Sequence, residues 1–361
     1  MQTSFLSHAD AALRNRNNIL HFVKKYGPIS RTDIWGKLNI SRASVTQVIR
    51  QLQENDLIVE TGEGESTGGR KPVYIEFNGA ARKLYAFDWV SRSLCLMDLS
   101  GRILAERTLD FASGLTPMAF AAAVEREIAQ LDTQDLYRPD ELLGFGIALP
   151  GLIDHCSATV LYSVELGWQN VSLQALFHER FGEHIYLERT GNIMALGANT
   201  SGEARGVSHL QLIILSHDGI GASAVIHGDC QHGANYMYGE LGHIKMLSDV
   251  VCSCGQRGCI EAVVNDLMIC SGGVITEQIL EYLSIAASTA LNISDAGYCI
   301  LVGSYVDALT PAQKLALSDR IRQKLTGTHL RRIQICFCHD MRRLSLDGIC
   351  ANVFDRYFSV N

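Results

Sequence analysis

Near the start of the chain, apolar residues recur at the spacing of an amphipathic helix. Apolar side chains between positions 13 and 23 fall on one helical face, and the pair Gly27-Pro28 ends this pattern. Ser30, with Asp33 three positions later, predicts a capped start for a short helix through Leu38. These features predict two helices joined by a turn.

A third helix is predicted from the N-cap Ser41 to about Gln53. Apolar residues at i, i+3, i+4 and i+7 define its buried face, and these are Val45, Val48, Ile49 and Leu52. On and beside the opposite, polar face lie candidates for contact with base edges or phosphates of duplex DNA: Arg42, Ser44, Thr46, Gln47 and Arg50. Among them, the Gln47 amide can make a bidentate contact to adenine.

A predicted hairpin follows these helices. Two strands at 57–60 and 73–77 enclose a Gly/Ser-rich tip that ends in Arg70 and Lys71, both candidates for phosphate or minor-groove contact. Residues 1–79 are therefore predicted to be a winged helix-turn-helix DNA-binding domain, whose second motif helix enters the major groove. Such units also occur as pure interaction modules, so this alternative stays open.

Beyond residue 80, strands alternate with helices. Strands are predicted at 84–88, 94–98, 103–109, 143–148, 210–215, 222–227 and 298–302, with helices at 119–131 and 277–291. The order of three strands, a helix and a strand occurs twice, which predicts two similar α/β lobes around a cleft. We assign residues 80–196 to the first lobe, completed by a C-terminal helix at 340–361, and residues 197–339 to the second.

The second lobe contains a compact set of metal-ligand residues between positions 240 and 261. His243, Cys252, Cys254 and Cys259 supply four nitrogen and sulfur ligands, which is the number that closes a tetrahedral zinc shell. Because no position remains open for water, we expect one structural zinc ion per chain. The alternative is three ordinary reduced thiols in a loop. A second set at Cys336, Cys338 and His339 lacks a fourth ligand, so we interpret its cysteines as packing residues.

Charge and composition narrow the class of protein. The net charge is −7, but residues 1–78 carry ten Lys/Arg against eight Asp/Glu, which leaves −9 on the rest. A mildly basic head on an acidic body is typical of a modular DNA-binding protein. The start of the chain lacks the pattern of a signal peptide, no segment is apolar enough to span a membrane, and eleven cysteines fit a reducing compartment. We therefore expect a cytoplasmic protein.

Three motifs resemble the ROK family of sugar kinases and sugar-responsive repressors. They are Gly146–Asp154, Asp218–Ala222, and Glu240–His243 together with the cysteine cluster. The resemblance covers essentially the full chain and implies lobes of the actin/hexokinase-like (ribonuclease H-like) α/β fold. The N-terminal winged helix-turn-helix places the chain with the repressors, since family kinases lack it.

The resemblance also implies an effector site. Glu240, His243 and Glu261 match residues that contact sugar hydroxyls in the family, although both glutamates could instead support the zinc loop. Arg189 stands where family kinases have an asparagine beside their catalytic aspartate. It could favour an anionic ligand, or it could pair with a neighbouring carboxylate and close the pocket.

The resemblance to the ROK family also implies that kinase activity has been lost. Thr190 occupies the position of the catalytic aspartate, and a neutral hydroxyl is a poor general base. Residues 88–93 match the family's first phosphate motif but contain no glycine. At the position of a later Gly-Gly pair of the family, this chain has Gly303-Ser304. No catalytic residue is therefore assigned.

These observations predict a sequence-specific transcriptional regulator, expected to repress genes of carbohydrate metabolism. Its expected partners are a double-stranded DNA operator and a small carbohydrate-type effector. A homodimer or dimer of dimers is expected, because one recognition helix reads too few base pairs. The alternatives are an ATP-dependent sugar kinase with an added DNA-binding domain, and a regulator controlled by a protein partner.

Overall fold

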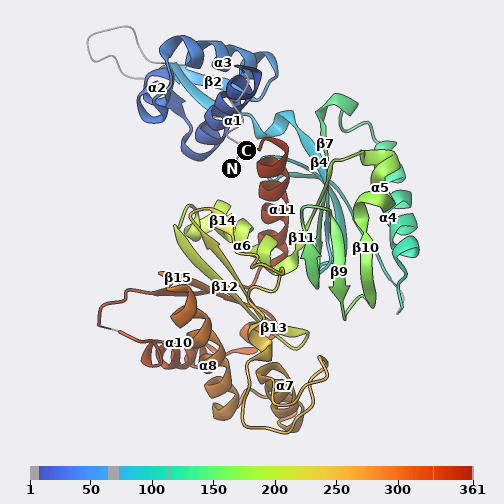
Figure 1. Cartoon of the computed structure of the whole chain (residues 1–361), viewed down its shortest axis with the longest axis vertical. Coiled ribbons are helices and arrows are strands. Elements are labelled where there is room, and N and C mark those ends of the chain that lie inside the picture. Colours follow the sequence, from blue (N-terminus) through green and yellow to red (C-terminus); the bar gives the residue numbers. More distant parts are fainter. Residues whose placement is uncertain (1–7, 64–72, 112–113, 328, 360–361) are drawn as a thin grey trace, which may run out of the picture.

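The N-terminal head is a three-helix unit with a small antiparallel sheet (Figure 1). The computed structural model of the chain describes residues 8–63, 73–111, 114–327 and 329–359. In the head, the helices are α1 (His8–Tyr26), α2 (Arg31–Leu38) and α3 (Arg42–Glu54), and the sheet order is β1 (Ile29–Ser30), β3 (Val73–Phe77), β2 (Ile58–Glu63). The hydroxyls of Ser30 and Ser41 accept from the backbone N–H groups of Asp33 and Ser44, as expected for N-caps. The predicted wing-tip residues Arg70 and Lys71 lie outside the described residues.

The first lobe is built on a five-stranded mixed sheet. Its order is β11 (Ile185–Arg189), β7 (Leu142–Leu149), β4 (Lys83–Asp88), β5 (Ser93–Asp98), β6 (Ile103–Thr108). Alternate side chains face opposite layers, so that Tyr85 and Phe87 pack toward α4 (Pro117–Asp132) and α5 (Leu173–Phe181). Leu84 and Ala86 face the layer of α6 (Thr190–Thr200) and α11 (Met341–Tyr357). Both faces of the central strand are thus buried.

A smaller antiparallel sheet, which the sequence analysis did not predict, extends the first lobe. Its strands are β8 (Leu152–Asp154), β9 (Thr159–Ser163) and β10 (Trp168–Ser172). These strands are short, and only some of their side chains are buried, so apolar alternation is weak.

The second lobe repeats the strand order of the first. It runs β14 (Asp229–Cys230), β13 (Gly219–Ile226), β12 (His209–Ser216), β15 (Tyr298–Val302), β16 (Gln334–Phe337). In both sheets an antiparallel meander is followed by two parallel strands. The helices of this lobe are α7 (Ile260–Cys270), α8 (Glu277–Ser294), α9 (Ser304–Ala308) and α10 (Pro311–Gln323). The predicted pair of similar α/β lobes is confirmed.

Helices α6 and α11 cross at unusually close range. A Cβ atom added to Gly348 would lie 1.8 Å from the Ile193 carbonyl oxygen, and one added to Gly197 would lie 1.9 Å from that of Leu344. Only glycine permits this approach. Helix α6 begins in the cleft between the lobes, so α11 is packed directly on an element that starts at the cleft.

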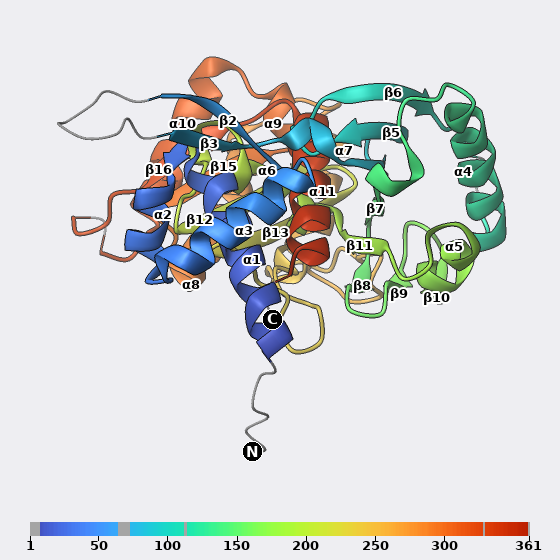
Figure 2. The ribbon, with the colours of Figure 1, turned by 90° about the horizontal axis from the view of Figure 1, so that it is seen from above.

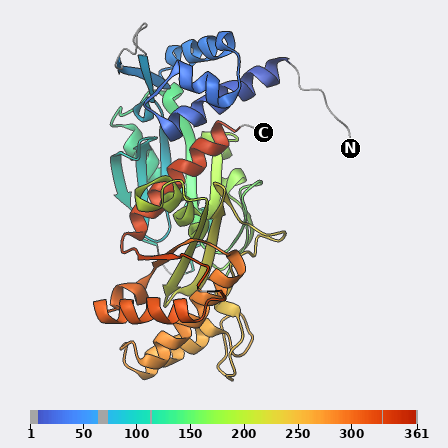
Figure 3. The same ribbon diagram turned by 90° about the vertical axis from the view of Figure 1, so that its left-hand side faces the viewer.

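The head rests on the C-terminal end of α11 (Figures 2 and 3). Asn17 of α1 donates to the Ser359 carbonyl at 2.7 Å, and the Lys24 ammonium lies 3.5 Å from the centroid of the Phe354 ring. Head residues such as Ile19 and Leu20 share one buried apolar cluster with Ile349 and Val353 of α11. The head and the body therefore form a continuous core. No described helix combines the length and hydrophobicity that a membrane crossing requires.

Candidate functional site

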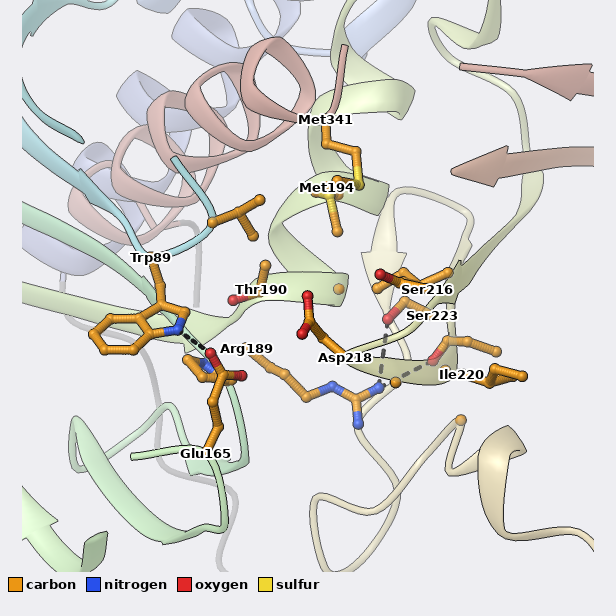
Figure 4. Close-up of a pocket in the computed structure, with 18 of the residues that line it drawn as sticks. Trp89, Glu165, Arg189, Thr190, Met194, Ser216, Asp218, Ile220, Ser223 and Met341 are labelled. Atoms are coloured by element: carbon orange, nitrogen blue, oxygen red, sulfur yellow. Dashed lines mark hydrogen bonds between the residues drawn. The ribbon is translucent and has the colours of Figure 1, made fainter. Parts of the chain in front are cut away.

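A cavity of about 430 Å³ lies between the lobes. Figure 4 shows side chains from both lobes around it. The first lobe contributes Trp89, Arg92, Glu165, Arg189 and Thr190 among others, and the second contributes residues of the 218–223 turn, Glu240 and Glu261. This cavity is large enough for a small organic ligand. It brings together three of the four predicted effector residues, while His243 does not line it.

Arg189 crosses the cavity from the first lobe to the second. Its guanidinium donates to Glu240 Oε1 at 2.8 Å and to the carbonyl oxygens of Ala222 and Tyr238 at 3.0 and 2.8 Å. Figure 4 shows Arg189 reaching Ser223 of the second lobe. Only 15% of the side chain is exposed. Arg189 was expected either to favour an anionic ligand or to pair with a neighbouring carboxylate. The structure shows the pairing, so the carboxylate of Glu240 already balances the positive charge of Arg189.

Thr190 follows Arg189 at the first position of α6. Its hydroxyl is buried and has no hydrogen-bond partner within the described residues. Gly191 lies next to it, where an added Cβ atom would come within 2.8 Å of the Ser223 hydroxyl of the second lobe. The N-terminus of α6 thus lies at the cleft with one polar group that a ligand could satisfy.

The two glutamates of the predicted effector set have different surroundings. Glu240 is 39% exposed and places Oε2 3.6 Å from Nε2 of His243. Glu261 Oε2 accepts from the backbone N–H of Ile220 at 2.9 Å. Glu261 therefore fixes the glycine turn that opens the second lobe, while Glu240 connects Arg189 to the imidazole of His243.

The first phosphate motif is filled by side chains. The Arg92 guanidinium carbon lies 3.2 Å from the centroid of the Trp89 indole, whose N–H donates to Glu165. Asp88 is fully buried and accepts from the Ser91 hydroxyl and from Ser345 of α11, each at 2.6 Å. A large aromatic ring and internal hydrogen bonds thus occupy a region where phosphate binding would need open backbone N–H groups.

The predicted metal residues converge on one point of the second lobe. One ligand atom each of His243, Cys252, Cys254 and Cys259 lies within 4.8 Å of all the others. The distance between Cys254 and Cys259 Sγ is 3.7 Å, which fits the edge of about 3.8 Å for a tetrahedron with Zn–S bonds of about 2.3 Å. His243 turns Nδ1 toward Cys252 at 3.8 Å and Nε2 toward Glu240. The donor set and its carboxylate support are consistent with structural zinc.

The face of α3 opposite the head core is accessible. Arg42, Thr46, Gln47 and Arg50 are exposed, whereas Ser44 is half-buried and bonds to the capping Ser41. Their roles in DNA binding stay predictions.

Two side chains of the second candidate metal-ligand set contact other residues of the chain. Cys336 lies 3.2 Å from the Tyr298 hydroxyl, and His339 contacts Asp307. The described residues contain no metal-ligand cluster at that place.

Sequence reasoning missed the groups that hold Arg189 in place. Two of its acceptors are backbone carbonyl oxygens, and the residues involved lie 33 and 49 positions away in the chain. No local pattern signals such contacts. It also missed Ser304, whose hydroxyl lies 2.9 Å from His217 Nδ1, although the Gly303-Ser304 pair after a buried strand marked the position.

Comparison with known proteins agrees with this architecture. The ROK family model matches residues 91–296, and the MarR family model matches residues 15–61. A putative xylose repressor of Caldicellulosiruptor sp. (strain Rt8B.4) is 32% identical over 273 residues, 73% of this chain and 67% of that protein. The DNA-binding transcriptional dual regulator NagC of Escherichia coli (strain K12) is 29% identical over 262 residues, 71% and 63% of the two chains.

Solved structures show the same fold. A ROK family transcriptional regulator, described as a homolog of the E. coli MLC protein, superposes with a TM-score of 0.80 at 19% identity, over 97% of this chain and 98% of that one. A ROK hexokinase from Thermus thermophilus gives 0.61 at 19% identity, over 75% and 97%. The chain belongs to the ROK family and carries a MarR-like helix-turn-helix in front of its two lobes.

Proposed function

We propose that this protein is a sequence-specific DNA-binding transcriptional regulator that senses a carbohydrate and has no kinase activity. The observation that carries the proposal is the direct packing of the head on α11, which itself packs on α6 at the cleft. The putative xylose repressor among its relatives supports a repressor of carbohydrate metabolism, and the dual regulator NagC supports a DNA-binding regulator. In this reading, residues 1–79 bind DNA, 80–196 with 340–361 form the first lobe, and 197–339 form the second.

The head supplies the contacts to DNA. Helix α3 presents Arg42, Thr46 and Gln47 on its exposed face, with Arg50 one turn further on. Short polar and amide side chains at the start of a recognition helix suit base edges, and the arginines suit phosphates. We expect two heads per functional unit, with recognition helices about 34–36 Å apart on a near-palindromic operator.

The cleft supplies the sensor. Because Glu240 neutralises Arg189, the cavity as it stands favours a neutral sugar whose hydroxyls donate to carboxylates and to the Thr190 hydroxyl. His243, Cys252, Cys254 and Cys259 would hold one structural zinc ion in the loop between Glu240 and Glu261. Its four-ligand set leaves no open position, so the ion would order the wall that carries Glu240 and Glu261.

Kinase chemistry is not supported by the groups in the cleft. Thr190 has no carboxylate to remove a proton from a sugar hydroxyl, and Trp89 fills the first phosphate motif. Incubation with ATP and a panel of pentoses, hexoses and N-acetylhexosamines should therefore give no phosphosugar. Turnover that Glu240→Gln abolishes would reverse this conclusion in favour of a sugar kinase with an added head.

DNA binding is tested by selecting genomic fragments and measuring affinity by fluorescence anisotropy at fixed salt. Gln47→Ala should weaken binding to the selected site by about 1–3 kcal/mol, roughly 5- to 150-fold, with little effect on random duplex. Gln134→Ala, an exposed glutamine on the first lobe, is the matched control. Equal binding to selected and random DNA would indicate that the head is an interaction module, and a pull-down would then identify a protein partner.

A further inference from the structure

A second group of metal-ligand side chains lies at the junction of the two lobes. His155 follows β8, Glu188 is in β11, and His232 follows β14, so two come from the first lobe and one from the second. One ligand atom of each lies within 4.8 Å of the other two. Because neighbouring residues on a strand face opposite sides, Glu188 points away from the cleft that Arg189 enters.

The carboxylate of this group is buried and only partly engaged. Glu188 is 3% exposed. Its Oε1 accepts from the Arg189 backbone N–H and the Asn192 amide, whereas Oε2 lies 2.7 Å from His232 Nε2. Oε2 therefore has a lone pair for a further ligand.

The neighbouring histidine carries a buried nitrogen without a partner. The His155 ring stacks on His232 with centroids 4.1 Å apart, and its Nδ1 has no hydrogen bond within the described residues. A buried polar atom is costly to leave without a partner, so this nitrogen points to a missing ligand.

The charge states suit metal binding. Burial and the nearby His232 lower the pKa of His155, which keeps its imidazole neutral. Burial opposes ionisation of Glu188, but His232, the Arg189 N–H and the Asn192 amide together outweigh it and leave the pKa of Glu188 below its usual value. Neutral imidazole and ionised carboxylate are the forms that coordinate metals.

We propose that His155, Glu188 and His232 form a second metal site, for a divalent transition-metal ion such as zinc. Two imidazoles and a carboxylate are a common ligand set for zinc, with one position left open. Bonds of about 2.0–2.1 Å place ligand atoms about 3.4 Å apart. The 2.7 Å contact between Glu188 and His232 must therefore open slightly, and the His155 ring must leave its stack on His232. The ion would join the lobes and shares no ligand with the His243 site.

Cobalt titration of the metal-free full chain tests this site. The thiolate site should fill first, with strong near-ultraviolet absorption from sulfur-to-cobalt charge transfer. A second equivalent should then add weak visible absorption without further near-ultraviolet change. Zinc content by native mass spectrometry should likewise reach two ions per chain. Saturation at one equivalent would overturn the proposal.

Two variants and one control locate the second ion. His155→Ala and the nearly isosteric Glu188→Gln should each weaken the second equivalent at least tenfold, while the near-ultraviolet band reports an intact first site. His178→Ala removes a histidine of α5 that is 61% exposed and belongs to neither metal-ligand group, and should leave both equivalents unchanged. A second equivalent that persists with unchanged affinity in both His155→Ala and Glu188→Gln would contradict the assignment.

Discussion

At the scale of single residues, the cleft is defined by what its charged groups already contact. Arg189 is matched by Glu240 and two carbonyl oxygens, and Glu261 holds the backbone of Ile220. Both side chains therefore shape the pocket before any ligand arrives. Such preorganisation lowers the cost of ordering on binding.

The zinc ligands give a prediction at this scale. Cys254→Ala should abolish the thiolate-to-cobalt absorption and lower the melting temperature, because structural zinc contributes on the order of 10 kcal/mol in small modules. Cys270→Ala, at another exposed cysteine, should change neither property. A Cys254→Ala protein that keeps the full thiolate band would show that the ligand set is wrong.

A buried phenol pair predicts the response to alkaline pH. Tyr85 and Tyr137 both donate to Asp132 Oδ1 at 2.6 Å. Burial and these bonds raise the pKa of Tyr137 to about 12, and they raise that of Tyr85 as well. Since unfolded tyrosine titrates near 10, the stabilisation is complete below about pH 10 and declines as the pH rises through about 12.

Urea unfolding at pH 8 and pH 11 measures this effect. The native protein should lose more free energy of unfolding between these values than Tyr137→Phe, by on the order of 1 kcal/mol after solvent screening. Tyr162→Phe, at a tyrosine that is 50% exposed, should behave like the native chain. Equal losses in all three proteins would show that the phenol pair does not control alkaline stability.

At the scale of elements, the contact between α6 and α11 is the central feature. Gly197 and Gly348 let the two backbones touch, and Ser345 connects α11 to Asp88 of the first lobe. We therefore expect a change at the start of α6 to act on α11, the helix on which the head rests. Rigid helices packed this closely move together more readily than they deform.

Gly348→Ala tests the packing of these helices. The new methyl group would meet the Ile193 carbonyl at 1.8 Å, so the helices must separate. We expect a loss of at least 1–3 kcal/mol in the free energy of unfolding, typical of overpacking. Gly36→Ala, where nothing lies within 4 Å of an added Cβ, is the control. A stable Gly348→Ala protein with unaltered DNA affinity would argue against tight contact.

Much of the element pattern could be predicted because it is local. The capped helices of the head and the two meanders follow from spacing and end signals. The convergence of His243 with the three cysteines could be predicted from ligand type. The β8–β10 sheet and the pairing of Arg189 could not, since they depend on side chains brought together only by the fold. The exposed face of α3 follows from the local spacing of its apolar residues, whereas its DNA contacts stay a prediction.

At the scale of the whole molecule, a continuous series of packed elements connects the cleft to the head. The lobes meet at Arg189, α6 leaves the cleft, α11 crosses α6, and α1 sits on the end of α11. A ligand that changes the separation of the lobes would therefore change the position of the head. In a dimer, such movement alters the distance between recognition helices.

The most direct test is operator affinity with and without a sugar that calorimetry shows to bind the chain. The account predicts that saturating sugar changes the dissociation constant for the selected operator at least fivefold, a coupling of 1 kcal/mol or more. Affinity for random duplex should change much less. A sugar that binds in the cleft and leaves operator affinity unchanged would contradict the account.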